Sequence, residues 1–132
     1  MQSNKINEKG AKKLRRILLA EDDETMRNFL SRSLTKAGYQ VVTVSHGIEA
    51  LPHLSAERFD LLLTDIVMPG MDGIELARRA TNMHNDMPVM FITGFAAVAM
   101  DRSQERPKNS KLLQKPFHLK DLVDEVERIL AA

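Results

Sequence analysis

Five short, continuous apolar runs recur along this chain, and segments with helical spacing separate them. The runs are Ile17–Ala20, Val41–Val44, Leu61–Leu63, Val89–Ile92 and Leu112–Leu113. Runs of this length that are rich in Leu and β-branched residues are typical of strands buried on both faces. Because parallel neighbours need crossover connections, strands that alternate with helices predict an α/β layer fold with a parallel sheet.

The segments between the runs differ in how well they suit a helix. Residues 26–34 and Leu119–Leu130 place apolar side chains at helical spacing, and the second stripe is the strongest. Pro52 falls inside the Ile48–Leu54 pattern, so this helix is expected to be short or to begin late. Asp101–Ser110 is wholly polar, which predicts at most a short helix followed by a mobile loop.

Polar groups follow directly on four of the five runs. They are Glu21–Asp22, Asp65, Thr93–Gly94 and Lys115–Pro116, and Met68–Pro69 with Asp72–Gly73 is expected to complete the same pocket. Parallel strands end at one edge of a sheet, so these groups should gather in a crevice there. Carboxylates brought together repel one another, and a hard cation such as Mg²⁺ relieves that repulsion.

Each of these residues also has an ordinary structural explanation. Asp22 and Asp23 are favoured at a helix start as cap and dipole partner, and the two roles can fall to different residues. Thr93 at a strand end is often a partner of local backbone, and a single lysine is usually solvated. Asp65 either caps the following loop or is a nucleophile that becomes an acyl phosphate beside a metal. In the second case Lys115 and Thr93 would contact the phosphoryl oxygens.

Size and composition predict one domain of ordinary size. The chain has 132 residues and a mass of 14.9 kDa. Residues 1–16 contain six basic residues and one acidic residue, a net charge of +5, whereas the whole chain carries +1. We therefore expect a basic, flexible extension at 1–14 and one domain at 15–132. The extension is either a solvated tail or a contact for nucleic acid or anionic lipid.

Three features that the sequence lacks bear on the cellular compartment of the protein. It contains no cysteine, so disulfides and thiolate metal sites are excluded. No stretch approaches the roughly 20 apolar residues that a membrane span needs, and no secretory signal is visible. These features predict a cytoplasmic protein that does not insert into membranes.

The polar motifs, taken together, resemble the receiver domain of bacterial two-component response regulators. The matching pieces are Leu19–Asp23, Thr64–Gly73, Ile92–Gly94 and Lys115–Phe117, and the resemblance covers about residues 15–132. It implies the flavodoxin/CheY-like fold, a doubly wound five-stranded parallel sheet of order 2-1-3-4-5 with helices on both faces.

The resemblance also implies a role for each residue of the expected pocket. Asp65 would accept a phosphoryl group from a histidine kinase or a histidine phosphotransfer protein. Glu21, Asp22, Asp65 and the backbone carbonyl of Val67 would bind Mg²⁺. The chain would then be a signalling receiver rather than an enzyme, although it supports its own Mg²⁺-dependent phosphorylation.

Other positions bear on how such a switch would behave. The resemblance implies that Thr93 and Lys115 sense and stabilise the phosphoryl group. Val67 and Phe95 flank the expected position of the hydrolytic water, and because neither side chain can orient water, slow dephosphorylation is expected. Many receivers carry an aromatic residue where this chain has Leu112, so a different readout surface is expected.

A narrower resemblance is to the single-domain CpdR-type regulators of alphaproteobacteria, carried by Asp60–Ala80, Phe91–Ala99 and Leu130–Ala132. It implies control of regulated proteolysis, in which the unphosphorylated form primes the ClpXP protease and phosphorylation switches it off. The end Leu130–Ala132 is either a frayed helix end or a degradation signal. A phosphorelay shuttle to or from a histidine phosphotransfer protein is the alternative function.

Two further classes of protein are disfavoured. A Mg²⁺-dependent phosphatase would usually carry a second Asp two residues after its nucleophile, and this chain has Val67 there. Direct DNA binding is not expected, because no second domain or recognition helix is visible.

Overall fold

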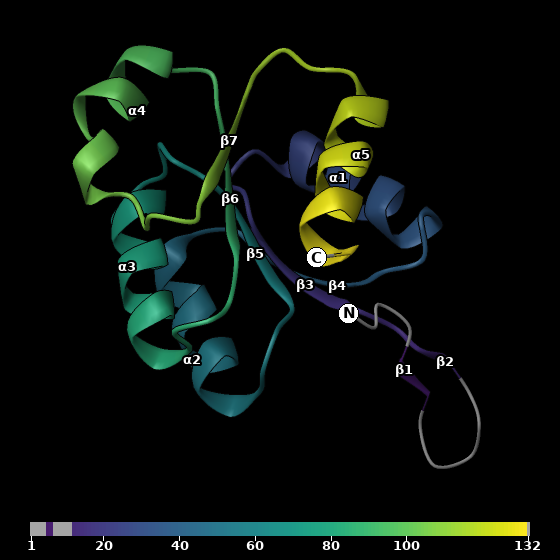
Figure 1. The fold of residues 1–132 in the computed structure, drawn as a ribbon. Helices are drawn as coiled ribbons and strands as arrows, with labels where there is room; N and C mark the ends of the chain where they lie inside the picture. The colour runs from purple at the N-terminus through teal and green to yellow at the C-terminus, as the bar shows by residue number, and fades with distance from the viewer. Residues whose placement is uncertain (1–4, 7–11, 132) are drawn as a thin grey trace.

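The computed structural model describes residues 5–6 and 12–131 of the chain, so Ala132 and most of the expected extension lie outside the described residues. Figure 1 shows the arrangement of its elements. In chain order they are β1 (Lys5–Ile6), β2 (Lys12–Lys13), β3 (Arg16–Ala20), α1 (Glu24–Lys36), β4 (Gln40–Val44), α2 (Gly47–Ala56), β5 (Leu61–Asp65), α3 (Gly73–Met83), β6 (Val89–Thr93), α4 (Ala96–Asp101), the 3₁₀ helix η1 (Ser103–Glu105), β7 (Lys111–Gln114) and α5 (Leu119–Ala131). Of these, β1 and β2 form a small antiparallel pair.

The main sheet confirms the predicted topology. Its five strands lie in the order β4-β3-β5-β6-β7, and every neighbouring pair is parallel. Counted along the chain from β3, this is the order 2-1-3-4-5. The five predicted apolar runs all fall within these strands, and the carboxyl ends of β3, β5 and β6 therefore meet at one edge.

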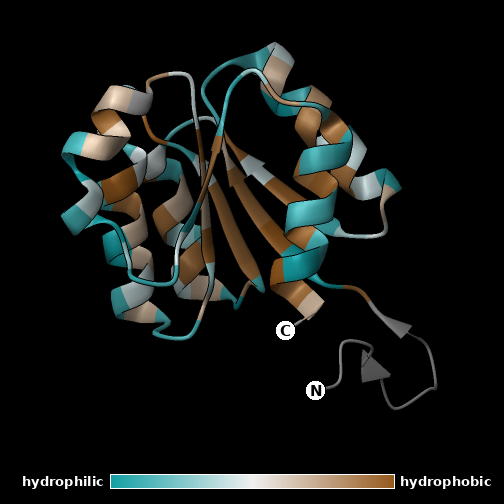
Figure 2. Cartoon of the chain, turned by 45° about the horizontal axis from the view of Figure 1, so that its top comes forward, coloured by the Kyte–Doolittle hydropathy of each residue, from teal (hydrophilic) through white to brown (hydrophobic). Residues whose placement is uncertain are grey.

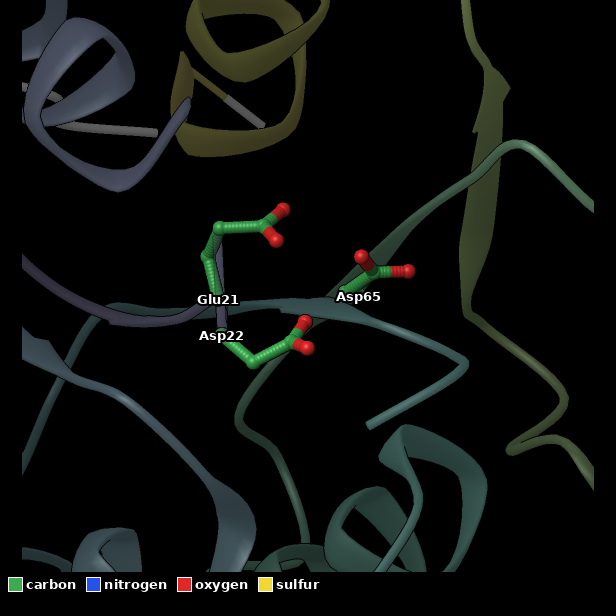
Figure 3. Close-up of side chains that lie close together, drawn as sticks. All are labelled: Glu21, Asp22 and Asp65. Atoms are coloured by element: carbon green, nitrogen blue, oxygen red, sulfur yellow. The ribbon is translucent and has the colours of Figure 1, made fainter. Parts of the chain in front are cut away.

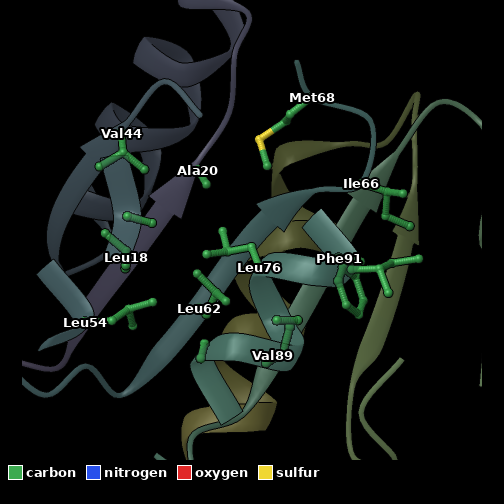
Figure 4. Packing of buried hydrophobic residues seen from close by; sticks show 14 of the residues in the cluster. Leu18, Ala20, Val44, Leu54, Leu62, Ile66, Met68, Leu76, Val89 and Phe91 are labelled. Carbon is green, nitrogen blue, oxygen red and sulfur yellow. The ribbon is translucent and has the colours of Figure 1, made fainter. Parts of the chain in front are cut away.

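Helices cover both faces of the sheet (Figure 2), and each face has its own core, one of which is drawn in Figure 4. On one face, side chains such as Leu62 and Phe91 pack with buried residues of α2 and α3. On the other face, Leu63 and Ile92 pack with buried residues of α1 and α5. Successive residues of a strand point to opposite faces, so a strand covered on both sides must be apolar throughout.

The expectation that all five strands are buried on both faces was wrong for the two edge strands. All residues of β5 and β6 are buried, whereas β7 is mostly exposed and Leu112 keeps 37% of its surface accessible. Only the last residue of β4, Val44, is buried. An edge strand has a neighbour on one side only, so the helices cover it less completely.

Two uncertain helices are also resolved. The helix α2 begins five residues before Pro52 rather than after it, so the expected late start was wrong. Buried Ala50 and Leu54 anchor it to the core, and such packing outweighs the one backbone hydrogen bond that proline removes. The expected short helix after the fourth run is confirmed as α4, followed by η1. None of the described helices has the length and hydrophobicity that crossing a bilayer requires.

Candidate functional site

Three carboxylates from two neighbouring strands meet at the carboxyl edge of the sheet. Glu21 and Asp22 directly follow β3, and Asp65 is the last residue of β5 (Figure 3). One oxygen from each carboxylate lies within 4.8 Å of the other two. Glu21 and Asp65 are buried, whereas Asp22 is exposed. Two of the three carboxylates are therefore enclosed by the protein, and the third faces water.

Local backbone contacts hold the first two acids in place. The Glu21 N–H donates to the carbonyl of Val44 at 3.2 Å, which extends the pairing of β3 and β4 by one residue. Asp23 is the N-cap of α1, and its side chain accepts from the Met26 N–H at 3.2 Å. The capping and clustering roles are thus divided between adjacent residues, because only Asp23 faces the first turn of the helix.

Lys115, which directly follows the edge strand β7, completes the cluster. Its Nζ lies 3.1 Å from Asp65 Oδ2 and 3.3 Å from Glu21 Oε1. The Lys115 N–H donates to the carbonyl of Thr93 at 2.7 Å, so the lysine backbone is tied to the end of β6. The Lys115–Pro116 peptide bond is cis, which nothing in the sequence had indicated.

The pKa values of Glu21 and Lys115 are both raised in the cluster, but for different reasons. Burial raises the pKa of Glu21 to about 7, and the negative charge of Asp65 adds to this, although the Asp23 N–H and Lys115 oppose it. Burial of Lys115 acts to lower its pKa, but its contacts with Asp65 and Glu21 raise it above the usual value. Lys115 therefore carries a positive charge at neutral pH, while Glu21 is destabilised as an anion.

Gly73 allows the first turn of α3 to approach the backbone of Asp65. A Cβ atom at this position would lie 1.9 Å from the carbonyl oxygen of Asp65 and 3.0 Å from the Cα of Ile66. The Gly73 N–H donates to the carbonyl of Ile66 at 2.8 Å. No side chain other than hydrogen fits there, so Gly73 holds Asp65 in position from behind.

Thr93 lies one residue beyond the strand partner of Asp65, at the end of β6, and is fully buried. Its hydroxyl accepts from the Phe95 N–H at 2.9 Å, which is the local backbone role considered above. Val67 lies against the cluster, since its N–H donates to Asp65 Oδ1 at 3.4 Å. The side chains of Val67 and Phe95 are 41% and 58% exposed.

Asp72 lies near the pocket in sequence but is not one of the three clustered acids, because it opens α3. It is the N-cap of α3, and its side chain accepts from the Glu75 N–H at 2.9 Å. It also pairs with Arg102, which bonds to Glu105 as well. Sequence reasoning missed Arg102, because it lies in the polar segment for which no partner was visible.

Residues 17–127 match the response regulator receiver domain family, which covers most of the chain. The chain therefore belongs to this family, and its sheet has the strand order that the family resemblance implied. It is 58% identical over 119 residues to the response regulator receiver protein CpdR of Brucella abortus. That match covers 90% of this chain and 99% of the relative.

Solved structures of response regulators are similar to this chain in fold. A response regulator receiver protein from Sinorhizobium medicae is 33% identical, with a TM-score of 0.84, and the match covers 91% of this chain and 97% of that one. The response regulator TrrA of Thermotoga maritima, in complex with Mg²⁺-BeF, is 27% identical with a TM-score of 0.79. Here the match covers 88% of this chain and 99% of TrrA.

Proposed function

We propose that the chain is a phosphorylation-dependent switch in which Asp65 is the phosphoacceptor. The observation that carries the proposal is the contact of Lys115 Nζ with Asp65 Oδ2 beside two further carboxylates. A carboxylate is a usable nucleophile toward phosphorus only where cations neutralise the incoming phosphoryl oxygens. Membership of the receiver family supports this assignment.

The donor set of the acidic cluster fits Mg²⁺. Carboxylate oxygens are the hard ligands that this ion prefers, and an exposed Asp22 leaves room for the waters it retains. Glu21, Asp22, Asp65 and the carbonyl of Val67 would hold the ion. When bound, Mg²⁺ supplies positive charge that neutralises the acids and the phosphoryl oxygens. The Mg²⁺-BeF complex of TrrA supports this ligand for a related pocket.

The residues of the chain itself account for the remaining requirements of the transfer. An oxygen of Asp65 attacks phosphorus, a new P–O bond forms, and the P–N bond of the phosphohistidine donor breaks with its electron pair leaving on the imidazole. Lys115 shifts its contact from the carboxylate of Asp65 to a phosphoryl oxygen. The Thr93 hydroxyl, which accepts from the Phe95 N–H, turns to donate to a second phosphoryl oxygen. Asp65 and Glu21 are buried, which limits the positions that their carboxylates can adopt.

The direct test is incubation with acetyl phosphate and Mg²⁺, followed by intact mass. We expect the mass of one phosphoryl group to be added to the native chain, and none to Asp65→Asn or to the native chain in excess EDTA. An Asp22→Asn variant keeps the nucleophile and should be phosphorylated only at higher Mg²⁺. Undiminished phosphorylation of Asp65→Asn would reject the assignment.

The phosphorylated chain should lose its phosphate slowly, with a half-life of minutes to hours. Hydrolysis needs an oriented water, and the exposed side chains of Val67 and Phe95 have no polar atom to orient it. Val67→Asn adds such an atom and should shorten the half-life several-fold, measured by intact mass after donor removal. Val98→Asn makes the same exchange on exposed α4 and is the control. A half-life of seconds for the native chain would contradict the prediction.

We further propose that the switch controls regulated proteolysis, with the unphosphorylated form acting as an adaptor for ClpXP. The 58% identity to CpdR over nearly the whole of that protein supports this role. The alternative is a phosphorelay shuttle, which the apolar Val67 and Phe95 suit equally well. Binding of ClpX by the unphosphorylated form alone favours the adaptor, whereas phosphate transfer to and from a histidine phosphotransfer protein favours the shuttle. The cognate kinase or phosphotransfer protein would in either case act in the cytoplasm.

A further inference from the structure

A cavity lies at the opposite end of the sheet from the acidic cluster. It has a volume of about 910 Å³ and is bounded by loops that precede β3, β5, β6 and β7 and by the end of α5. In Figure 1 the last turn of α5 lies at this end of the sheet. The acidic cluster lies at the carboxyl ends of the strands, so this cavity plays no part in the proposed phosphorylation.

Cations outnumber acids among the residues that line this cavity. Four lining residues are basic, and two are acidic: Arg15, Arg16, Arg58 and Lys108 against Asp60 and Asp86. The four basic residues come from three separate segments of the chain. The tertiary structure, not a run of basic sequence, therefore brings them together. Positive charge gathered in a concave site attracts anions more strongly than the same charge on a flat surface.

Acids neutralise part of this charge, and the part that involves Arg16 is held firmly. Asp60 Oδ2 accepts from the backbone N–H of Arg16 at 2.7 Å, so it serves the start of β3. The guanidinium of Arg16 is committed to Glu57 and lies 5.0 Å from the centroid of the Phe59 ring.

Two of the other cations, Arg58 and Lys108, are open to a ligand. Arg58 and Asp86 are 3.4 Å apart, and their side chains are 73% and 83% exposed, so this pair is weak and readily exchanged. Within residues 5–6 and 12–131, no ion pair or hydrogen bond engages the side chain of Lys108. Arg58 and Lys108 are thus the cations that a ligand can recruit without breaking a strong contact.

The lining is not only charged. Apolar residues with accessible surface, among them Leu14 and Ile129, also line the cavity, and Asn85 and Asn109 add amide groups. A volume of about 910 Å³ falls in the range of sites that hold organic ligands, which is roughly 300–1,000 Å³. A bare inorganic anion would leave most of this space and all of the apolar surface unused.

We propose that this cavity binds a nucleotide-sized organic phosphate. The phosphate groups would be held by Arg58 and Lys108, because guanidinium and ammonium groups form strong charge-assisted hydrogen bonds to phosphate oxygens. A flat ring would lie against the apolar side chains, and the asparagine amides would bond to its polar edge. Such a ligand would reach the end of the sheet opposite Asp65 and would be bound independently of phosphorylation.

The test is a titration of the full-length ¹⁵N-labelled chain with ADP, followed by backbone amide NMR in EDTA. EDTA removes divalent ions and so keeps the acidic cluster out of the experiment. We expect saturable shifts centred on Arg58, Asn85 and Lys108. Inorganic pyrophosphate should bind at least tenfold more weakly, because it carries the charge without the ring.

Matched variants locate the site. The double variant Arg58→Ala with Lys108→Ala should weaken ADP binding by about a hundredfold, since each charge-assisted contact is worth roughly a factor of ten. Both side chains are exposed, so the fold should be retained, and the amide spectrum reports this directly. Arg79→Ala removes a half-exposed arginine from α3, outside the cavity, and should leave binding unchanged.

Several results would overturn the proposal. They are the absence of saturable shifts at millimolar ADP, shifts centred on Glu21 and Asp65, pyrophosphate binding as tight as that of ADP, and equal weakening by Arg79→Ala. Without saturable shifts, or with shifts at the acidic cluster, ADP would not bind in this cavity. Equally tight pyrophosphate binding would mean that the organic part of the ligand is not recognised. Equal weakening by Arg79→Ala would mean that only the net charge of the protein matters.

Discussion

Replacing Gly73 with alanine is expected to cost on the order of 3 kcal/mol of folding stability and to abolish phosphorylation of Asp65. The added Cβ would lie 1.9 Å from the Asp65 carbonyl oxygen, which is backbone and cannot rotate away. Either α3 or the end of β5 must move. Since Lys115 Nζ lies 3.1 Å from Asp65 Oδ2, a shift of the strand end by an ångström breaks the cluster. Urea unfolding measures the first effect, and intact mass after acetyl phosphate treatment measures the second.

Gly94→Ala is the matched control, because it makes the same exchange at the end of the neighbouring strand. A Cβ there meets no atom within 4 Å, and the residue is not among the glycines with positive φ. Its stability should change by less than about 1 kcal/mol, and phosphorylation should persist. If Gly73→Ala behaved like Gly94→Ala, the close approach of α3 to Asp65 would not be what positions the acid.

Replacing Lys115 with alanine is expected to cost about 2 kcal/mol of stability in EDTA and to slow phosphorylation strongly. It leaves Glu21 and Asp65, whose side chains are 1% and 9% exposed, without their shared cation. Losing one partner of a buried ion pair costs about 3–5 kcal/mol, and the 23% exposure of Lys115 reduces that figure here. Added Mg²⁺ should recover part of the loss, since it supplies positive charge to the same acids. Thermal unfolding with and without Mg²⁺ measures this difference.

Lys120→Ala controls for the loss of a lysine ion pair as such. Lys120 Nζ lies only 2.8 Å from Asp124 Oδ2, which is closer than either contact of Lys115. Its side chain is 82% exposed, however, and water screens the pair, so its removal should leave the stability nearly unchanged. Equal losses for the two variants would mean that burial does not strengthen the Lys115 contacts.

The positions of the acidic pocket could be predicted because they follow the strand pattern. Asp65 comes directly after an apolar run, and so do Glu21 and Asp22. In a parallel sheet that pattern alone brings the strand ends together, whatever the details of packing. Asp72 shows the limit of this reasoning: it lies close in sequence to Asp65, yet it caps α3 and pairs with Arg102.

Contacts between elements could not be predicted, because no sequence periodicity encodes them. Arg102 reaches Asp72 across 30 positions of the chain. The exposure of Leu112 depends on β7 being an edge strand, which follows from strand order and not from the apolar run itself. The cavity at the amino ends of the strands likewise collects Arg58 and Lys108 from loops 50 positions apart.

The amino-acid sequence by itself determined the parallel α/β sheet and the residues at its carboxyl edge, since hydrophobic runs and the polar residues that follow them act locally along each strand. Only the tertiary structure decided how closely α3 approaches Asp65, which acids share Lys115, and where the opposite end of the sheet gathers positive charge. Those outcomes depend on distances between segments that are remote in the chain, and packing of the two cores sets these distances.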